Sequence, residues 1–435
     1  MKSYDSYRDS EVEWIGEIPS GWIVSKFKFD TLNPVQYGIN ISSDKYVDEG
    51  IRFVRITDIN EDGSLNPNNG RYLISDDVPE EFLLNKYDVL FCRSGHTVGK
   101  SYFHTTDGQF TSGGYLVRFN FRNYTESKFV FYLSKTNFYW DWIKLNTVVS
   151  TIENVNGDKY QNFIYPKPPH NEQQQIVSFL DTKTSLIDSL IEKTQRKIEL
   201  LKEKRTSLIN EVVTKGLNPN VEMKDSGVEW IGKIPKGWRI GKLYQYSEMS
   251  NGSTPSRVKP EYWENGTIPW MSSGEINKKK IRDIDGRITQ EGFENSSTKI
   301  LPIGTVMMGL NGQGKTKGTV GILEIETTCN QSLCGMIFKD DMYPMFSYYF
   351  LDSQYYHIRG LVGEGQREGI SVSFLGRYPL VVPPISEQQQ IVEYLDEQTQ
   401  LIDKTISIEE KRIELLKEYR QSLISEVVTG KRKVV

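Results

Sequence analysis

The chain has 435 residues, which is too long for a single hydrophobic core and enough for two domains with connections between them. A hydrophobic content of 37% and a charged content of 25% are typical of a folded soluble protein and exclude extensive disorder. No apolar run reaches the roughly 18 residues that would cross a bilayer, so we expect no membrane partner.

The balance of charge does not favour a nucleic-acid partner. The net charge is −4, whereas contacts with phosphates use Lys and Arg. Residues 23–165 hold 15 basic and 17 acidic side chains, and residues 239–380 hold 16 and 15. If DNA is the partner, positive charge must therefore gather on one face, or a partner protein must supply some of it.

The N-terminus and the cysteines indicate an intracellular chain. The opening residues, MKSYDSYRDS, lack the apolar core of a signal peptide. Cys92, Cys329 and Cys334 are odd in number and form no CxxC pair. We expect reduced, buried thiols in a cytoplasmic protein, with no disulfide and no zinc site. The four histidines show no metal-ligand spacing, so no metal site is predicted.

An internal repeat organises the chain. The segment VEWIGEIPSGW at residues 12–22 returns as VEWIGKIPKGW at residues 228–238, with nine of eleven positions identical. The helix-like segment at residues 198–214 returns at residues 413–429 with fourteen of seventeen identical. The stretches between these borders look much less alike. A duplicated frame holding divergent inserts indicates one shared mechanical role and two different recognition roles. Trp14, Trp22, Trp230 and Trp238 recur in both copies, so they are interpreted as packing residues that seat each domain on the frame.

The first domain, residues 1–165, is predicted from short strand-like runs separated by turns. One polar, glycine-containing loop lies between two such runs and combines hydrogen-bond donors with residues that permit close approach. Its candidate DNA contacts are Arg93, Ser94, His96, Thr97 and Lys100. An ordinary solvated turn is the alternative interpretation of this loop.

A long helix is predicted within residues 166–221. It follows Pro168-Pro169, with Asn171 as the expected N-cap, and meets no further glycine or proline until Gly216, a rod of roughly 60 Å. Apolar residues recur at alternating spacings of four and three, which is typical of a coiled-coil seam. The apolar seam residues are Leu180, Ile187, Ile191, Ile198, Leu201, Leu208 and Val212.

The second domain, residues 222–380, contains the most tempting catalytic motif. Residues 309–316, GLNGQGKT, match the phosphate-binding pattern GxxxxGK[ST], but the following residues 317–325 favour a strand where that motif needs a helix. We interpret the segment as a glycine-rich hairpin loop. The candidate DNA contacts in this domain are Asn311, Gln313, Lys315 and Lys317 in that loop, Lys278, Lys279, Lys280 and Arg282 in the densest basic cluster, and Gln366 and Arg367 in a third loop.

A second long helix is predicted within residues 381–435, with Ser386 as its expected N-cap. Its seam repeats the first, with polar residues in the same three slots. The apolar seam residues are Leu395, Ile402, Ile406, Ile413, Leu416, Leu423 and Val427. We expect the two seams to pair antiparallel, giving a pseudo-twofold dumbbell. Packing of each helix on its own domain alone is the alternative. Further apolar positions beside the seam, such as Leu190, Leu200, Ile209 and Val213, predict that helices of a partner join a bundle.

Taken together, the WIGxIPxGW openings, the proline-proline junctions followed by EQQQIV, and the IELLKExRxSLIxEVVT helices resemble the specificity subunit of type I restriction-modification systems over essentially the whole chain. The resemblance implies an α+β fold, with two α/β target recognition domains joined by two long antiparallel coiled-coil helices. It implies that each domain reads one half of a split site in double-stranded DNA, and that the helices set the spacing.

The resemblance also implies the partners and a division of labour. Two methyltransferase subunits would dock on the frame and bring S-adenosylmethionine, and restriction subunits would bring ATP and Mg²⁺, so this chain would bind no cofactor and catalyse no step. The adenine methyltransferase motif [DN]PP[YF] is absent from the sequence. A coiled-coil scaffold joining two protein-binding modules and a phosphate-loop enzyme are the alternatives from other classes.

Overall fold

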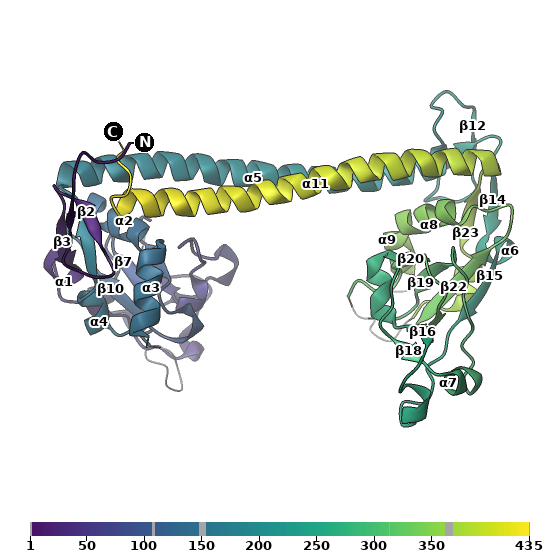
Figure 1. Ribbon diagram of the computed structural model, residues 1–435, viewed down its shortest axis with the longest axis horizontal. Helices are drawn as coiled ribbons and strands as arrows, with labels where there is room; N and C mark the ends of the chain where they lie inside the picture. The colour runs from purple at the N-terminus through teal and green to yellow at the C-terminus, as the bar shows by residue number, and fades with distance from the viewer. Residues whose placement is uncertain (1, 107–108, 148–153, 313, 362–368, 435) are drawn as a thin grey trace. The chain divides into compact units, whose positions relative to one another are not determined.

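The computed structural model describes the chain except for residues 1, 107–108, 148–153, 313, 362–368 and 435. It divides into two compact units, Met1–Gln195 with Lys411–Val435, and Arg196–Glu410. Each unit therefore holds one globular domain together with a part of each long helix (Figure 1).

Unit 1 builds its domain from short strands. It has two antiparallel strand pairs, β1 (Tyr7–Asp9) with β2 (Glu17–Pro19) and β3 (Ile23–Lys26) with β11 (Ile164–Lys167). A four-stranded sheet has the order β4 (Gln36–Tyr37), β10 (Leu116–Phe119), β7 (Val89–Cys92) and β8 (Ser101–Phe103). A three-stranded sheet has the order β6 (Tyr72–Leu73), β5 (Ile51–Val54) and β9 (Phe110–Ser112).

The helices of unit 1 cover the four-stranded sheet and close an aromatic core. They are α1 (Phe27–Asp30), α2 (Tyr124–Leu133), α3 (Asn137–Asn146) and α4 (Gly157–Gln161). Phe27 lies edge-on to the rings of Phe119 and Phe163, with centroids 5.5 and 5.1 Å away. Edge-to-face pairs of this kind stabilise a core beyond the area that they bury.

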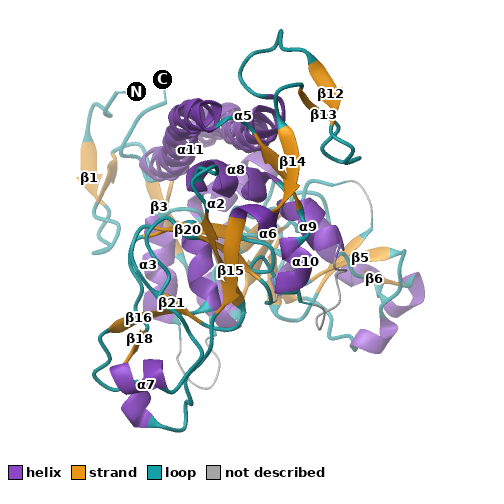
Figure 2. Ribbon diagram, turned by 90° about the vertical axis from the view of Figure 1, so that its right-hand side faces the viewer, coloured by secondary structure: helices purple, strands orange, loops and turns teal. Residues whose placement is uncertain are grey.

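Unit 2 repeats this plan with different sequence. Its strand pairs are β12 (Met223–Asp225) with β13 (Lys233–Pro235), and β14 (Arg239–Lys242) with β23 (Pro379–Val382). A five-stranded sheet has the order β15 (Ser247–Asn251), β22 (Leu333–Phe338), β19 (Val306–Gly309), β20 (Val320–Leu323) and β17 (Lys280–Ile281). A three-stranded sheet has the order β18 (Arg287–Ile288), β16 (Ile268–Met271) and β21 (Thr328–Cys329). The helices are α6 (Leu243–Tyr246), α7 (Gln290–Glu294), α8 (Pro344–Ser353), α9 (Tyr355–Leu361) and α10 (Val372–Gly376) (Figure 2).

The two long helices, α5 (His170–Lys215) and α11 (Ile385–Val428), begin earlier than the sequence predicted. The expected N-caps, Asn171 and Ser386, lie inside the first turn, so that prediction is wrong. The carbonyl groups of Pro169 and Pro384 accept the first helical hydrogen bonds, from the N–H groups of Gln173 (2.9 Å) and Gln388 (3.0 Å). Proline fits here because the carbonyl of a capping residue is used while its missing N–H is not needed.

The predicted seams are confirmed, and they pair. Every seam position on both helices is buried or half-buried. In unit 2, Lys197 Nζ lies 2.5 Å from Glu409 Oε1, and Arg205 Nε lies 3.0 Å from Asp403 Oδ1. The partners fall in number along α11 as the residues rise along α5, so the helices run antiparallel.

Unit 1 pairs the same two helices through Arg420, whose Nε donates to Asp188 Oδ1 at 2.9 Å. Arg420 repeats Arg205, which makes the corresponding bond in unit 2. Polar seam residues therefore bond across to the other helix in each unit. Such contacts fix the register of a helix pair more than they stabilise it. The alternative, in which each helix packs on its own domain alone, is wrong.

A duplicated bond ties each domain to the start of a long helix. The indole Nε1 of Trp22 donates to Glu172 Oε2 at 3.0 Å, and that of Trp238 donates to Glu387 Oε2 at 2.8 Å. Both indoles are buried. The packing role predicted for these two tryptophans is confirmed.

The other pair of repeated tryptophans behaves differently. Trp14 and Trp230 are half-exposed, with 50% and 45% of their surface accessible. Trp230 stacks on His357 with ring centroids 3.9 Å apart. The prediction of a packing role therefore holds in full only for Trp22 and Trp238.

A second duplicated contact explains a polar break in each seam. Tyr132 donates its hydroxyl to Asp181 Oδ1 at 2.5 Å and lies 3.2 Å from the Thr184 hydroxyl. Tyr349 of α8 donates to Asp396 Oδ1 at 2.6 Å. Burial and the neighbouring carboxylate raise the pKa of Tyr132, so the phenol stays a donor. The domains thus dock on the helices through polar bonds as well as apolar contact.

The burial predicted for the three cysteines is confirmed. Cys92, Cys329 and Cys334 are free and buried, and burial raises the pKa of each thiol to about 12. Within the described residues, no helix is long and apolar enough to span a membrane.

One buried lysine makes a testable contribution to stability. Lys135 Nζ donates to the carbonyl of Ser101 at 3.2 Å and lies 4.6 Å from the centre of the Phe131 ring. Desolvation lowers the pKa of Lys135 to about 7, although Asp62 acts in the opposite direction.

We predict that Lys135→Met removes part of the pH dependence of unfolding. Between pH 7 and about 10.4, the unfolded chain binds a proton at Lys135 that the folded chain does not, so this group makes stability rise with pH by at most about 1.4 kcal/mol per unit. Urea unfolding at pH 7 and pH 9 should show a smaller gain for the variant than for the parent. Exposed Lys144→Met is the matched control, and an unchanged pH slope in Lys135→Met would contradict the assignment.

Candidate DNA interface

The loop between β7 and β8 carries the first set of predicted DNA contacts. Arg93 Nε donates to the carbonyl of Gly114 at 3.0 Å, and its guanidinium lies 4.8 Å from the ring centre of Tyr37 and 5.9 Å from that of Tyr115. These contacts hold the cation in one orientation. Its neighbour His96 is exposed.

The other residues of this loop face protein. Ser94 and Thr97 are buried, and the Thr97 hydroxyl donates to the carbonyl of Ser94 at 3.2 Å. Lys100 Nζ is paired with Glu61 Oε1 at 2.7 Å. Sequence reasoning could not separate surface residues from supporting ones within a polar loop. Of the five predicted contacts in this loop, Arg93 and His96 reach the surface and have no acidic partner among the described residues.

The glycine-rich loop of the second domain lies where the sequence placed it. It joins the antiparallel strands β19 and β20, in which Met308 pairs with Val320. Asn311 and Lys315 are exposed, whereas Lys317 is buried. Gln313 lies outside the described residues.

Helix α9 holds this loop from behind. Arg359 Nη1 donates to the carbonyls of Gly314 (2.8 Å) and Lys317 (2.9 Å), and the Tyr355 hydroxyl donates to that of Lys315 (3.1 Å). The chain then enters strand β20, so the helix that a phosphate-binding loop requires does not follow the motif. The interpretation as a hairpin loop is confirmed.

We predict that Lys315→Ala leaves any ATP turnover of the purified chain unchanged, because strand β20 follows the motif in place of the helix whose N-terminus would hold the phosphates. The measurement is phosphate release by the parent and the variant under identical conditions. ATP turnover that disappears in Lys315→Ala would contradict the hairpin interpretation. The neighbouring exposed Asn311→Ala serves as the control for a general effect on the loop.

The positive charges of the densest basic cluster, Lys278–Lys280 with Arg282, are paired with acidic side chains. Each of its four cations has an acidic partner. Lys278 pairs with Asp283 (3.3 Å), Lys279 with Asp352, Lys280 with Asp396 (3.8 Å) and Arg282 with Glu324 (2.6 Å). Since Asp396 belongs to α11, the cluster lies beside the helix pair of unit 2. A cation already paired with a carboxylate releases fewer counterions on meeting DNA, so a phosphate role for this cluster is weakened. Gln366 and Arg367, the third predicted set, lie outside the described residues.

The structure reveals a polar surface in unit 1 that sequence reasoning missed. Strands β5 and β9 are parallel, so their C-terminal ends meet at one edge. The N–H of Gly113 donates to the carbonyl of Val54 at 2.9 Å, and Gly114 receives Arg93. Arg55, directly after Val54, therefore lies on the same edge as the predicted contact Arg93. We call this edge the strand-end surface.

Unit 2 has a topologically equivalent strand-end surface. Strands β16 and β21 are parallel, and the N–H of Asn330 donates to the carbonyl of Met271 at 3.1 Å. Thr254 donates to the side chain of Gln331 at 2.6 Å. The guanidinium of exposed Arg257 lies 4.8 Å from the ring centre of Trp263.

The two strand-end surfaces share backbone geometry and differ in side chains. Arginine, asparagine and glutamine are residue types that recognise base edges. The residues come from segments far apart in the chain, so no local motif marks them. Among the described residues, no group of three or more His, Cys, Asp or Glu side chains could hold a metal ion.

Comparison with known proteins gives this duplicated plan a class. Solved structures share the fold over almost the whole chain. One, described as the structural basis of complex assembly and conformational transition of the type I R-M system, has a TM-score of 0.73 at 16% identity and covers 94% of this chain and 98% of its own. The HsdS subunit from Thermoanaerobacter tengcongensis has a TM-score of 0.56 at 15% identity, with 95% and 98% covered.

Sequence comparison names the family. The model for the type I restriction modification DNA specificity domain matches residues 38–200 and 235–418, so the chain belongs to that family. The EcoR124I/EcoR124II specificity subunit of Escherichia coli is 28% identical over 61% of this chain and 63% of its own length. The putative type I restriction enzyme MjaX specificity subunit of Methanocaldococcus jannaschii is 25% identical over 97% of this chain and 96% of its own. The resemblance seen in the sequence is confirmed.

Proposed function

We propose that this chain is the non-catalytic specificity subunit of a type I restriction-modification complex in the cytoplasm, in which each domain reads one half of a bipartite site in double-stranded DNA. The observation that carries the proposal is the contrast between identical frame contacts and divergent strand-end surfaces. Trp22–Glu172 and Trp238–Glu387 make the same bond in both copies, whereas Arg93 and Arg257 have no equivalent in the other domain.

The long helices serve to fix the gap between the two half-sites. Two modules read the same face of a duplex only when their separation matches the helical repeat of about 34 Å. A helix pair locked by Arg205–Asp403 in one unit and Arg420–Asp188 in the other resists sliding. The gap should therefore have a fixed length and no sequence preference.

Catalysis belongs to the partners in this proposal. Two methyltransferase subunits bring S-adenosylmethionine and methylate an adenine in each half-site, and restriction subunits add ATP- and Mg²⁺-dependent cleavage. A flank of the helix pair supports the docking of a helical partner. Each exposed apolar residue on this flank comes one position before a seam residue, and each is between 36% and 58% exposed: Leu186, Leu190, Leu415 and Tyr419 in unit 1, and Leu200, Tyr394, Leu401 and Ile408 in unit 2.

The opposite flank, one position after the seam, faces the chain's own domains. There Ile209, Val213, Ile424 and Val428 are buried in the domain cores. The extra apolar positions thus fall into two groups. One group packs on the domains, and the other leaves a row of large apolar side chains in water. Rows of this kind mark surfaces that bind other proteins.

We predict that Leu401→Glu with Ile408→Glu weakens methyltransferase binding at the row of unit 2 and leaves the row of unit 1 intact. The number of methyltransferase subunits that co-purify, measured by native mass spectrometry, should fall from two to one. Lys404→Glu on the same helix is the control for added charge. Retention of two subunits in the double variant, with the helix content unchanged, would contradict the docking assignment.

The main test exchanges residues 23–165 for those of another specificity subunit. Because the entry and exit of the first domain lie side by side in the antiparallel pair β3–β11, the exchanged segment should fold as a closed insert. Methylome sequencing of cells that express the parent or the chimaera should show one half-site changed and the other half-site and the gap retained. A change in both half-sites would contradict the proposal that each domain reads one half-site independently. Identical methylation with and without the chain would favour the scaffold between protein-binding modules.

A further inference from the structure

One loop at the strand-end surface of the first domain is held in place by buried charge. After β5, the chain forms the short 3₁₀ helix η2 (Ile56–Asp58) and returns to β6 through residues 66–71, with the sequence NPNNGR. We call these residues the Asn66–Arg71 loop. Its middle is a second 3₁₀ helix, η3 (Pro67–Asn69), capped by Asn66, whose side-chain oxygen accepts the N–H of Asn68 at 3.0 Å.

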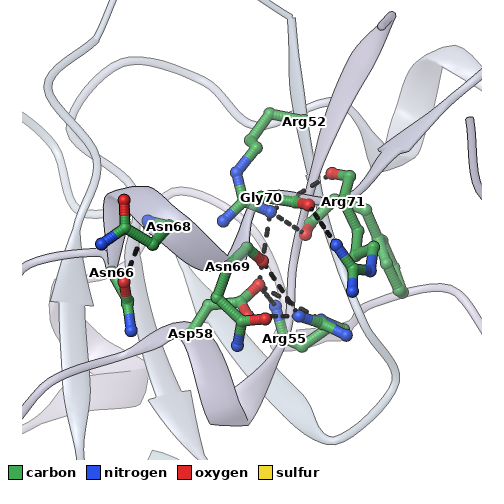
Figure 3. Close-up of polar contacts among 9 residues, drawn as sticks. Arg52, Arg55, Asp58, Asn66, Asn68, Asn69, Gly70 and Arg71 are labelled. Atoms are coloured by element: carbon green, nitrogen blue, oxygen red, sulfur yellow. Dashed lines mark hydrogen bonds and ion pairs between the residues drawn. The ribbon is translucent and has the colours of Figure 1, made fainter. Parts of the chain in front are cut away.

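The support beneath this loop is an ion network around Asp58, which is fully buried (Figure 3). Asp58 Oδ1 accepts a hydrogen bond from Arg55 Nη2 at 2.7 Å, and Oδ2 accepts one from Arg52 Nη1 at 3.3 Å. The hydrogen bonds to Asp58 raise the pKa of Arg55 further above its usual value. Both arginines are therefore anchored to the same carboxylate.

The same arginines grip the backbone of the loop. Arg55 Nη2 donates to the carbonyl of Asn69 at 3.0 Å, and Arg52 Nη1 donates to the carbonyl of Arg71 at 3.2 Å (Figure 3). The N–H of Asn66 donates to the backbone carbonyl of Asp58 at 2.8 Å. Bonds near both ends and in the middle therefore fix the loop before any ligand arrives. Fixing a recognition loop in advance reduces the entropy lost on binding.

Two polar side chains of the loop are turned to solvent. Asn68 and Arg71 are exposed, and Arg71 Nη1 makes a local bond of 2.9 Å to the carbonyl of Gly70. Among the described residues, no carboxylate lies within salt-bridge distance of Arg71, and no side chain pairs with the carboxamide of Asn68. This contrasts with the basic cluster at Lys278–Arg282, in which every cation has an acidic partner.

The local charge is suited to a polyanion. Arg52 and Arg55 share the single carboxylate of Asp58, so the network carries one net positive charge, and Arg71 adds another. Within the connection from β5 to β6, Glu61 is paired with Lys100 at 2.7 Å, and Asp62 accepts hydrogen bonds from Ser64. The remaining acidic residues of this hairpin stand at its other end, as the pairing of Ile51 with Leu73 shows. They are Asp48 and Glu49 before β5, and Asp76 and Asp77 after β6.

The second domain has the same backbone here without these side chains. The N–H of Phe53 donates to the carbonyl of Arg71 at 2.8 Å, and the N–H of Trp270 donates to that of Gly286 at 2.9 Å. Arg71 is therefore equivalent to Gly286, where an added Cβ would lie 2.4 Å from the carbonyl oxygen of Trp270.

The same register extends to the supporting arginines. Arg52 pairs with Tyr72 in the first domain, and Pro269 pairs with Arg287 in the second, so Arg52 is equivalent to Pro269. Counting onward from the two strand ends, Arg55 is equivalent to Ser272. The cations of the network thus belong to the first domain alone, and a feature that only one domain has is suited to reading only one half-site.

We propose that the Asn66–Arg71 loop is a base-reading element of the first half-site, with the Asn68 carboxamide contacting an adenine edge and the Arg71 guanidinium contacting a guanine edge in the major groove. This inference rests on the proposed function. Asparagine and arginine form bidentate pairs with these bases, and each good pair contributes about tenfold or more in discrimination against the wrong base.

The test uses the full chain co-purified with its methyltransferase partner and a library of random-sequence DNA duplexes. Bound duplexes are selected and sequenced for the parent, Asn68→Ala, Arg71→Ala and the control Arg122→Ala. Arg122 is an exposed arginine of the same unit that donates to the carbonyl of Phe29. Thermal unfolding of each complex verifies that these surface substitutions leave the fold intact.

The expected result is a loss of preference, about tenfold or more, for an adenine in Asn68→Ala and for a guanine in Arg71→Ala. Both losses should lie in the same half-site, with the other half-site and the gap unchanged, and Arg122→Ala should match the parent. Equal weakening on all sequences with an unchanged motif would make Arg71 a phosphate contact and overturn the assignment. Motifs identical to that of the parent in both variants would overturn it while leaving the proposed function standing. A parent complex that selects no bipartite motif would overturn the proposed function itself.

Discussion

The hydrogen bond between a buried indole and a glutamate at the start of each long helix is the constraint on which the rest of the structure depends. Trp22 stands just before β3, and Glu172 stands in the first turn of α5. The intervening chain leaves through β3 and comes back through β11, which pair antiparallel. A hydrogen bond to a charged group contributes about 1.5–3 kcal/mol. Because it closes the domain at its own base, everything between entry and exit can diverge without disturbing the frame, and the second copy uses Trp238 and Glu387 in the same way.

Each long helix has three surface strips that run along its length: the seam and one strip on either side of it. Positions one residue after the seam carry groups that meet the domains, such as Asp181 with Tyr132 and Asp396 with Tyr349. Positions one residue before it carry exposed leucines and aromatic side chains. The seam itself mixes apolar residues with threonines and with Arg205 and Arg420, whose carboxylate partners lie on the opposite helix. The seam thus faces the other helix and the strip after it faces a domain, so each helix has little freedom to rotate about its axis.

The predictable parts of this protein were those set by local periodicity. The seams appeared from a spacing of four and three, and the hairpin at residues 309–320 from glycines between strand-like runs. The error at the helix starts came from applying side-chain capping to Asn171 and Ser386 where the proline carbonyls perform that task. The site was predictable only in part. Arg93 lies on the strand-end surface, but Ser94, Thr97 and Lys317 are buried, and the lysines that stood out in the sequence are paired with acids that are remote in the chain. Asn68 and Arg71 carried no signal, because what makes them notable is the Asp58 network below them.

The negative net charge of the chain is compatible with sequence-specific DNA recognition. Unpaired positive charge gives DNA affinity on any sequence, and it adds equally to binding at correct and incorrect sites. Specificity depends on the ratio between those two affinities. A reader that pairs its densest basic cluster with its own acids, as at Lys278–Arg282, and leaves anchored cations at strand ends, as with Arg71 and Arg257, keeps sequence-independent binding weak. In the proposed complex, the DNA affinity that such a reader gives up comes from the methyltransferase subunits, so sequence recognition and binding strength are contributed by different chains.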